Sequence, residues 1–165
     1  MSSLSTLFGL SATGDEPKFM IAEYLIANIL ISHTLSSTRG LKWLWRIDNH
    51  VSPRTDLEKS GPRAVLEGRL AQSQLDMLRR NESAHANSME HFPVFAAALI
   101  LAKIAGLPAA DMNYVGLTYT LTRVAFVANY LLSTTLLGAS LRPVLWWTAH
   151  VACLKLIWRA GKAFN

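Results

Sequence analysis

Residues 79–95 read RRNESAHANSMEHFPVF and run directly into an apolar stretch at residues 96–104. The polar part of this segment carries one amide, one carboxylate and two imidazoles, which belong to Asn87, Glu90, His85 and His91. Ionisable groups at the end of a membrane helix are costly, so they usually face a bundle interior and serve a purpose. The segment therefore predicts a membrane helix whose polar end belongs to a functional site.

The composition of the whole chain also indicates a membrane protein. Hydrophobic residues make up 51% of the 165 residues, charged residues make up 16%, and the mean hydropathy is +0.24. A soluble domain of this size would carry about a quarter charged residues. The net charge of +5 comes mainly from one polar segment between hydrophobic runs. Such a segment fits an anionic membrane face better than a nucleic-acid recognition helix.

Four segments are long enough to cross a bilayer, which needs about 20 mostly apolar residues. They are residues 18–38, 82–105, 111–133 and 141–164. The expected fold is an all-α integral membrane protein in which a four-transmembrane-helix bundle forms a single domain over residues 17–165. Residues 1–16 are expected to be a flexible N-terminal tail.

Residues 39–80 form a basic segment between the first and second spans. The positive-inside rule places this segment in the cytosol. After Gly61 and Pro62, residues 64–78 are expected to be helical, so the second span would begin outside the bilayer. The next connection contains Gly106 and Pro108, which predict the helix break, and Asp111 could cap the helix that follows.

An up-and-down bundle brings the start of the second span, the end of the third and the start of the fourth to one leaflet. Asn87 and Glu90 are three positions apart on one face of the second span. Arg142 opens the fourth span. The third span carries one stripe of side chains, namely Tyr119, Arg123, Phe126 and Tyr130. Together these groups could surround a cavity for a small anionic or zwitterionic ligand, with an apolar co-substrate arriving from lipid.

Purely structural interpretations remain open for the same residues. Glu90 could pair with Arg123, because a buried carboxylate needs a partner in any case. Asn87 could merely bridge two helices, and Tyr130 could be a packing residue. Arg142 could simply reach lipid phosphate.

The histidines do not predict a metal site. His85 lies about half a turn from Asn87, so it should face another helix or subunit. The spacing of His85 and His91 does not place two ligands on one helical face, and no metal is therefore expected. The single cysteine, Cys153, lies in an apolar run and is expected to be a small buried hydrophobe.

The pattern A-x-x-N-x-x-E-x-x-P is met by Ala84, Asn87, Glu90 and Pro93. It resembles the signature of the MAPEG family, the membrane-associated proteins in eicosanoid and glutathione metabolism. The stretch RVAFVANY at residues 123–130 resembles the third-helix motif of that family. The resemblance covers residues 18–163, and it is closest to fungal members and to microsomal glutathione transferases.

That resemblance implies a homotrimer in the endoplasmic reticulum or a similar membrane, with glutathione held as co-substrate between adjacent subunits. By this analogy, Glu90 would accept the glutathione amino group and Asn87 would bond its backbone. Tyr130 would hold a carboxylate, Arg142 would stabilise the thiolate, and His85 would reach the ligand of the neighbouring protomer. The expected catalytic residues are Arg142 and Glu90, and the expected glutathione-binding residues are Asn87, Glu90, His91, Arg123, Tyr130 and His85.

Three classes of function follow from this site. The preferred one is a membrane-bound glutathione-dependent transferase or peroxidase acting on lipophilic electrophiles. The family pattern is altered at Ser83, His91 and Phe126, which motivates a second class: a glutathione-independent isomerase or cyclase of a hydrophobic metabolite. There Glu90 or His91 would be the general acid or base. The third class is a non-catalytic lipid-binding or scaffold protein whose basic segment docks a cytosolic partner.

Overall fold

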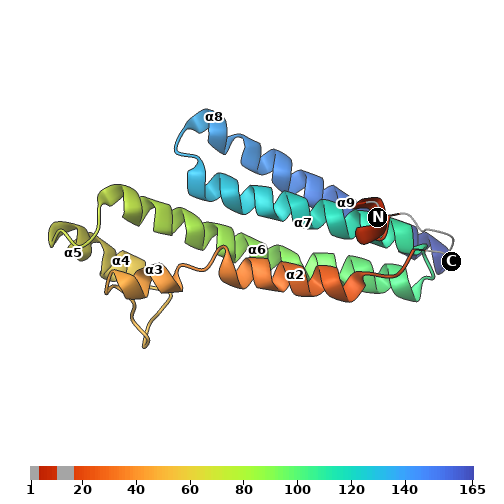
Figure 1. Cartoon of the computed structure of the whole chain (residues 1–165), viewed down its shortest axis with the longest axis horizontal. Coiled ribbons are helices and arrows are strands. Elements are labelled where there is room, and N and C mark those ends of the chain that lie inside the picture. The colour runs from red at the N-terminus through yellow and green to blue at the C-terminus, as the bar shows by residue number, and fades with distance from the viewer. Residues whose placement is uncertain (1–3, 11–16) are drawn as a thin grey trace.

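The computed structural model describes residues 4–10 and 17–165, and within them the chain is helical. The long helices are α2 (Ile21–Thr34), α6 (Gln72–Ile104), α7 (Ala109–Leu132) and α9 (Leu141–Ala163), which run along one axis (Figure 1). Short helices connect them: α1 (Leu4–Leu7), α3 (Arg39–Leu44), α4 (Asp56–Lys59), α5 (Gly61–Leu66) and α8 (Leu136–Ala139). No strand occurs in this part of the chain, so the all-α prediction is confirmed.

The four segments expected to cross a bilayer correspond to α2, α6, α7 and α9, with different bounds. α2 has 14 residues and ends at Thr34, whereas α6 has 33 residues and begins at Gln72. Judged by length and apolar character, none of the helices in residues 4–10 and 17–165 qualifies as a bilayer-crossing segment. This finding differs from the four spans that the sequence predicts.

α6 and α7 pack antiparallel, so residues later in α6 contact residues earlier in α7. Arg80 Nε of α6 donates to the Tyr130 carbonyl at the end of α7, at 3.0 Å. Further along α6, the Phe95 ring stacks on the Tyr119 ring with a centroid separation of 3.8 Å. α9 packs against both helices, and the core between them includes Cys153, which is fully buried as expected. The start of α6 and the end of α7 therefore lie at the same end of the bundle.

α2 packs closely against α7 at Gly116, which has no side chain. A Cβ atom on Gly116 of α7 would overlap the Tyr24 ring of α2, so only glycine allows this approach. The Tyr24 hydroxyl in turn donates to the Phe8 carbonyl at 3.0 Å, and Asn113 Nδ2 donates to the Gly9 carbonyl at 2.8 Å. Residues 4–10 of the expected flexible tail are thus held against the bundle, while residues 1–3 and 11–16 lie outside the description.

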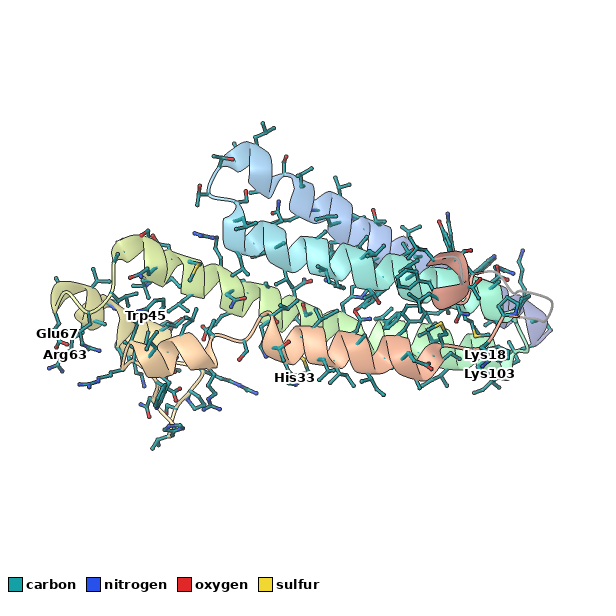
Figure 2. All side chains as sticks on the ribbon, viewed as in Figure 1. Lys18, His33, Trp45, Arg63, Glu67 and Lys103 are labelled. Carbon is teal, nitrogen blue, oxygen red and sulfur yellow. The ribbon has the colours of Figure 1, made fainter. Side chains whose placement is uncertain are left out.

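Residues 39–71 fold into a compact unit, the cap, beside the first turns of α6. The cap lies at the end of the molecule that carries Trp45, Arg63 and Glu67, opposite the end that carries Lys18 and Lys103 (Figure 2). It has its own hydrophobic core, which α6 completes; the buried members are Ile47, Leu57, Ala64, Leu70, Leu75 and Leu78. The basic segment is therefore a folded part of the protein.

Two local expectations are corrected by the structure. The helix expected over residues 64–78 is interrupted, because α5 ends at Leu66 and Gly68 adopts a φ of 71° before α6 begins. A left-handed glycine is a common way to stop a helix. Asp111 does not cap α7; its Oδ2 accepts from Arg159 Nη2 of α9 at 2.6 Å.

Candidate functional site

The expected site residues Asn87 and Arg123 meet between α6 and α7. Arg123 Nη1 donates to Asn87 Oδ1 at 2.9 Å, and the guanidinium carbon lies 5.3 Å from the centroid of the Phe126 ring. Arg123 is only 3% exposed, and its Nε and Nη2 find no acceptor among the described residues. The alternative in which Glu90 pairs with Arg123 is wrong, because Asn87 takes that position.

The expected residues Tyr130 and Arg142 meet where α7 ends and α9 begins. The Arg142 guanidinium carbon lies 4.0 Å from the centroid of the Tyr130 ring, which is a cation–π contact. Arg142 Nε donates to Asn129 Oδ1 at 3.1 Å, and Nη2 donates to the Ser133 carbonyl at 3.4 Å. The guanidinium is therefore oriented by α7, although no sequence motif singled out Asn129.

Glu90 and His85 lie on another face of α6, in a pocket of about 740 Å³ shared with α2 and the cap. We call it the α2–α6 pocket. Its lining residues are His33, Ser36, Ser37, Thr38, Arg39, Lys42, Asp48, Pro53, Arg54, Glu82, His85, Ala86, Met89 and Glu90. His85 packs on α2, with Nδ1 2.8 Å from the Ser32 carbonyl oxygen, so it faces another helix as expected.

The α2–α6 pocket contains both cations and carboxylates, and some of them are available to a ligand. Lys42 Nζ is already engaged by Asp56, at 2.7 Å, and by Glu82. Arg39 makes only a loose ion pair with Asp48, at 3.9 Å. Glu90 is exposed, and its side chain, like that of Arg54, makes no hydrogen bond or ion pair within residues 4–10 and 17–165. The pocket is thus lined by an unpaired carboxylate and by two accessible guanidinium groups.

His91 is separated from the other expected ligands. Its side chain is buried in the bundle, and its Nε2 lies 2.7 Å from His150 Nδ1 of α9. His91 lines neither of the two main pockets. His150 was not predicted as its partner, because the two residues are 59 positions apart and only the packing of α6 on α9 brings them together.

The expected site residues therefore lie in three separate places of one chain. Asn87 and Arg123 lie inside the bundle, Glu90 lies in the α2–α6 pocket, and Tyr130 and Arg142 lie at the junction of α7 and α9. No residue of α7, α8 or α9 lines the α2–α6 pocket. Across the described ranges, no three histidine, cysteine, aspartate or glutamate side chains come close enough to hold a metal ion.

Comparison with known proteins adds one finding to this geometry. No curated protein and no solved structure matches the chain. A model of the MAPEG family, in contrast, matches residues 25–162. This match includes α6, α7 and the cap in full, most of α2, and α9 up to Lys162. MAPEG proteins are membrane-associated and act in glutathione-related or eicosanoid metabolism, and this chain belongs to the MAPEG family.

Proposed function

We propose that this chain is a membrane-bound, glutathione-dependent transferase or peroxidase for lipophilic electrophiles, and that it acts as a homotrimer in the endoplasmic reticulum. The observation that carries the proposal is the unpaired carboxylate of Glu90 in the α2–α6 pocket, which the accessible guanidinium groups of Arg39 and Arg54 also line. MAPEG membership supports glutathione as the ligand that these charges would select.

The charges of the α2–α6 pocket fit those of glutathione. Glutathione carries one ammonium group and two carboxylates, and charge-assisted hydrogen bonds to such groups are about twice as strong as neutral ones. Glu90 would accept from the ammonium group, while Arg39 and Arg54 would each donate to a carboxylate. The volume of about 740 Å³ lies within the range of ordinary ligand sites.

The second half of the proposed site is Arg142. Its Nε and Nη2 are bonded to α7, whereas Nη1 has no hydrogen bond within the described part of the chain. A cation beside a thiol favours the thiolate and so lowers the thiol pKa. Because Arg142 and Glu90 lie on different faces of one chain, we propose that a neighbouring copy supplies Arg142 to each pocket. This division supports an assembly in which neighbouring copies share each site, as they would in the proposed homotrimer.

The chemistry that these residues would support needs little more than positioning. Arg142 holds the thiolate, which attacks an electrophilic carbon that diffuses in from lipid, forms a carbon–sulfur bond and releases the leaving group. With a lipid hydroperoxide, two thiols reduce the peroxide to an alcohol and water and are joined as a disulfide. Neither route requires a metal.

Titration calorimetry with glutathione and the purified protein tests the proposal. Glu90→Gln should weaken glutathione binding about tenfold or more, since a hydrogen bond to a charged group contributes about 1.5–3 kcal/mol. Ser83→Ala is the matched control, because Ser83 is exposed on α6 and its hydroxyl bonds only the Arg79 carbonyl among described residues. Absence of saturable binding at millimolar glutathione would exclude the proposed function.

A glutathione-independent isomerase or cyclase is the second candidate, and the same unpaired carboxylate supports it. An accessible Glu90 could move a proton on a hydrophobic substrate without any thiol. In that case Glu90→Gln would abolish turnover and Arg142→Ala would leave it unchanged. In the transferase, both substitutions would reduce turnover.

A further inference from the structure

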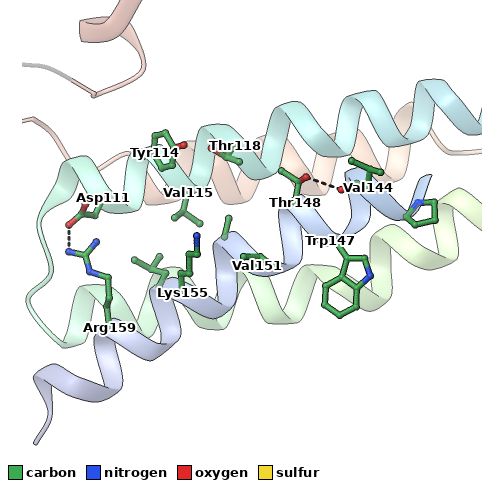
Figure 3. A pocket seen from close by; sticks show the side chains of 13 residues that line it. Asp111, Tyr114, Val115, Thr118, Val144, Trp147, Thr148, Val151, Lys155 and Arg159 are labelled. Atoms are coloured by element: carbon green, nitrogen blue, oxygen red, sulfur yellow. Dashed lines mark hydrogen bonds and ion pairs between the residues drawn. The ribbon is translucent and has the colours of Figure 1, made fainter. Parts of the chain in front are cut away.

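His91 of α6 and His150 of α9 share one hydrogen bond inside the bundle. Nε2 of His91 lies 2.7 Å from Nδ1 of His150, and the two rings stand at 76° to each other. His91 is 4% exposed, whereas His150 is half-buried. Another face of α9 lines an outer cavity together with α7, and Trp147, Val151 and Lys155 lie there (Figure 3). The histidine pair is therefore an inward contact that connects α6 to α9.

The proton of this hydrogen bond has one favourable position. Nδ1 of His91 is buried and has no hydrogen-bond partner among the described residues. A proton on this nitrogen would be a buried donor without an acceptor, in a site that already contains the Arg123 cation. The neutral pair therefore carries the proton on His91 Nε2, which donates to His150 Nδ1.

The surroundings of His91 oppose the addition of a second proton. Arg123 of α7 is buried, and its guanidinium carbon and the His91 ring lie 5.3 Å and 5.5 Å from the centroid of the Tyr119 ring. Within the described ranges, the charges that act on His91 are those of Arg123 and His150, and α2 contributes none. The other titratable groups of this region are Tyr119 of α7 and Cys153 of α9, which are uncharged at neutral pH, and Glu90 of α6, which lies in the α2–α6 pocket.

One added proton disrupts the contact whichever ring receives it. On His91 the proton binds Nδ1 and becomes a buried donor without an acceptor. On His150 it binds Nδ1, so that two N–H groups face each other across the contact. In both cases a second cation lies close to Arg123, whose Nε and Nη2 have no acceptor in the described part of the chain. The packed helices therefore require the neutral pair.

We propose that His91 and His150 form an acid-sensitive lock between α6 and α9, which is closed at neutral pH and opens when the pair takes up a proton. A free imidazole binds a proton near about pH 6.5, so the closed contact is stable above that value and weakens as the pH falls below it. Opening moves α9, which also carries Arg142 about two turns before His150. The lock itself needs no glutathione, so it is independent of the proposed function.

The single cysteine of the chain reports the opening. Cys153 lies about one turn after His150 and is 0% exposed, so separating α9 from α6 should make its thiol accessible. We expect a pyridyl disulfide to label the full chain in nanodiscs about tenfold faster at about pH 5.5 than at about pH 7.5, with each rate divided by that of a small model thiol at the same pH. Far-UV circular dichroism should stay unchanged. Equal normalised rates, or a loss of helix in acid, would overturn the lock.

The double variant His91→Gln with His150→Asn removes the titration and keeps a hydrogen bond. The side-chain amide of glutamine reaches the place of Nε2, and that of asparagine reaches the place of Nδ1. Labelling of Cys153 in this variant should no longer depend on pH after normalisation. His50→Asn is the matched control, because His50 is exposed in the cap, where it pairs with Asp48 at 3.3 Å, and it should keep the acid response. An acid response that persists in the double variant would overturn the proposal.

Trp146 provides a second measurement that does not depend on the folding of the double variant. Its ring stacks on His150 with a centroid separation of 4.5 Å and meets the His91 ring edge-on at 5.7 Å. In acid, tryptophan emission of the unaltered chain should shift to longer wavelength, and Trp146→Phe should remove most of this shift. Trp158→Phe should not, because Trp158 is exposed on the same helix, 69% open to solvent. An acid shift that is undiminished in Trp146→Phe would also overturn the lock.

Discussion

Arg123 of α7 and Asn87 of α6 form a hydrogen bond of 2.9 Å inside the bundle, and the arginine has no second acceptor there among the described residues. A buried guanidinium with a single acceptor depends strongly on that acceptor. The family motif residue Asn87 therefore has a structural role in its own chain, in addition to the glutathione contact that the family resemblance implies for it.

We expect Asn87→Ala to lower the free energy of unfolding by about 1–3 kcal/mol, because it leaves the buried Arg123 with no hydrogen-bond acceptor. Denaturant unfolding in detergent measures the change. The double variant Asn87→Ala with Arg123→Met should lose less than the sum of the two single variants, since removing both partners leaves no unpaired group. If the two single variants lower the free energy of unfolding by amounts that simply add in the double variant, Asn87 does not stabilise the bundle through Arg123.

Asn129→Ala should disturb catalysis through Arg142, because Asn129 Oδ1 accepts from Arg142 Nε at 3.1 Å. We expect kcat to fall about tenfold with little change in the KM for glutathione, which corresponds to about 1.4 kcal/mol. A less well-placed cation raises the thiol pKa, so the acidic limb of the pH–rate profile should move to higher pH. In an Arg142→Ala background, Asn129→Ala should have no further effect; an undiminished effect there would contradict a positioning role.

Lys42→Met should strongly destabilise the cap. The Lys42 side chain is 5% exposed, and it neutralises the Asp56 side chain, which is 0% exposed. Removing one partner of a buried pair costs about 3–5 kcal/mol, because the other charge is left uncompensated. Lys59→Met, on the exposed side of α4, should change stability by no more than about 0.5 kcal/mol. Similar unfolding midpoints for the two variants would show that the pair does not stabilise the cap.

Two glycine-to-alanine substitutions should change the stability of the protein in opposite directions. Gly116→Ala should destabilise the bundle by about 1–3 kcal/mol, since its Cβ would overlap the Tyr24 ring. Gly161→Ala in α9 meets no atom within 4 Å and should stabilise the helix by about 0.5–1 kcal/mol. Thermal unfolding measures both changes: the midpoint should fall for Gly116→Ala and rise for Gly161→Ala. A destabilised Gly161→Ala would contradict this prediction and would mean that another molecule packs against α9 at Gly161.

The parts of the structure that follow helical periodicity could be predicted from the sequence. Tyr119, Arg123 and Phe126 of the predicted stripe share one buried face of α7, because these positions recur every three or four residues, whereas Tyr130 is half-buried at the end of the helix. The helix breaks near Gly106 and Pro108 were also predicted, since both residues disfavour helix continuation. Local rules were sufficient for these features.

The features that could not be predicted depend on packing between distant segments. The contact between His91 and His150, and the joining of Lys42, Asp56 and Glu82, require that the helices are already placed. Gly68 is a local signal for the break between α5 and α6, because glycine readily adopts the positive φ that ends a helix. The separation of the expected site residues into three places could not be inferred from helical periodicity alone.

α6 contributes to two separate hydrophobic interiors, because Leu75 and Leu78 complete the core of the cap while Phe95 and Leu99 belong to the bundle. Deleting residues 39–71 would expose Leu75 and Leu78 to solvent at the free end of a long helix. A truncated protein could then adhere to other proteins through those leucines alone. A search for proteins that recognise the basic segment is therefore better made with a charge reversal at an exposed position outside the α2–α6 pocket, such as Lys59, in the intact chain.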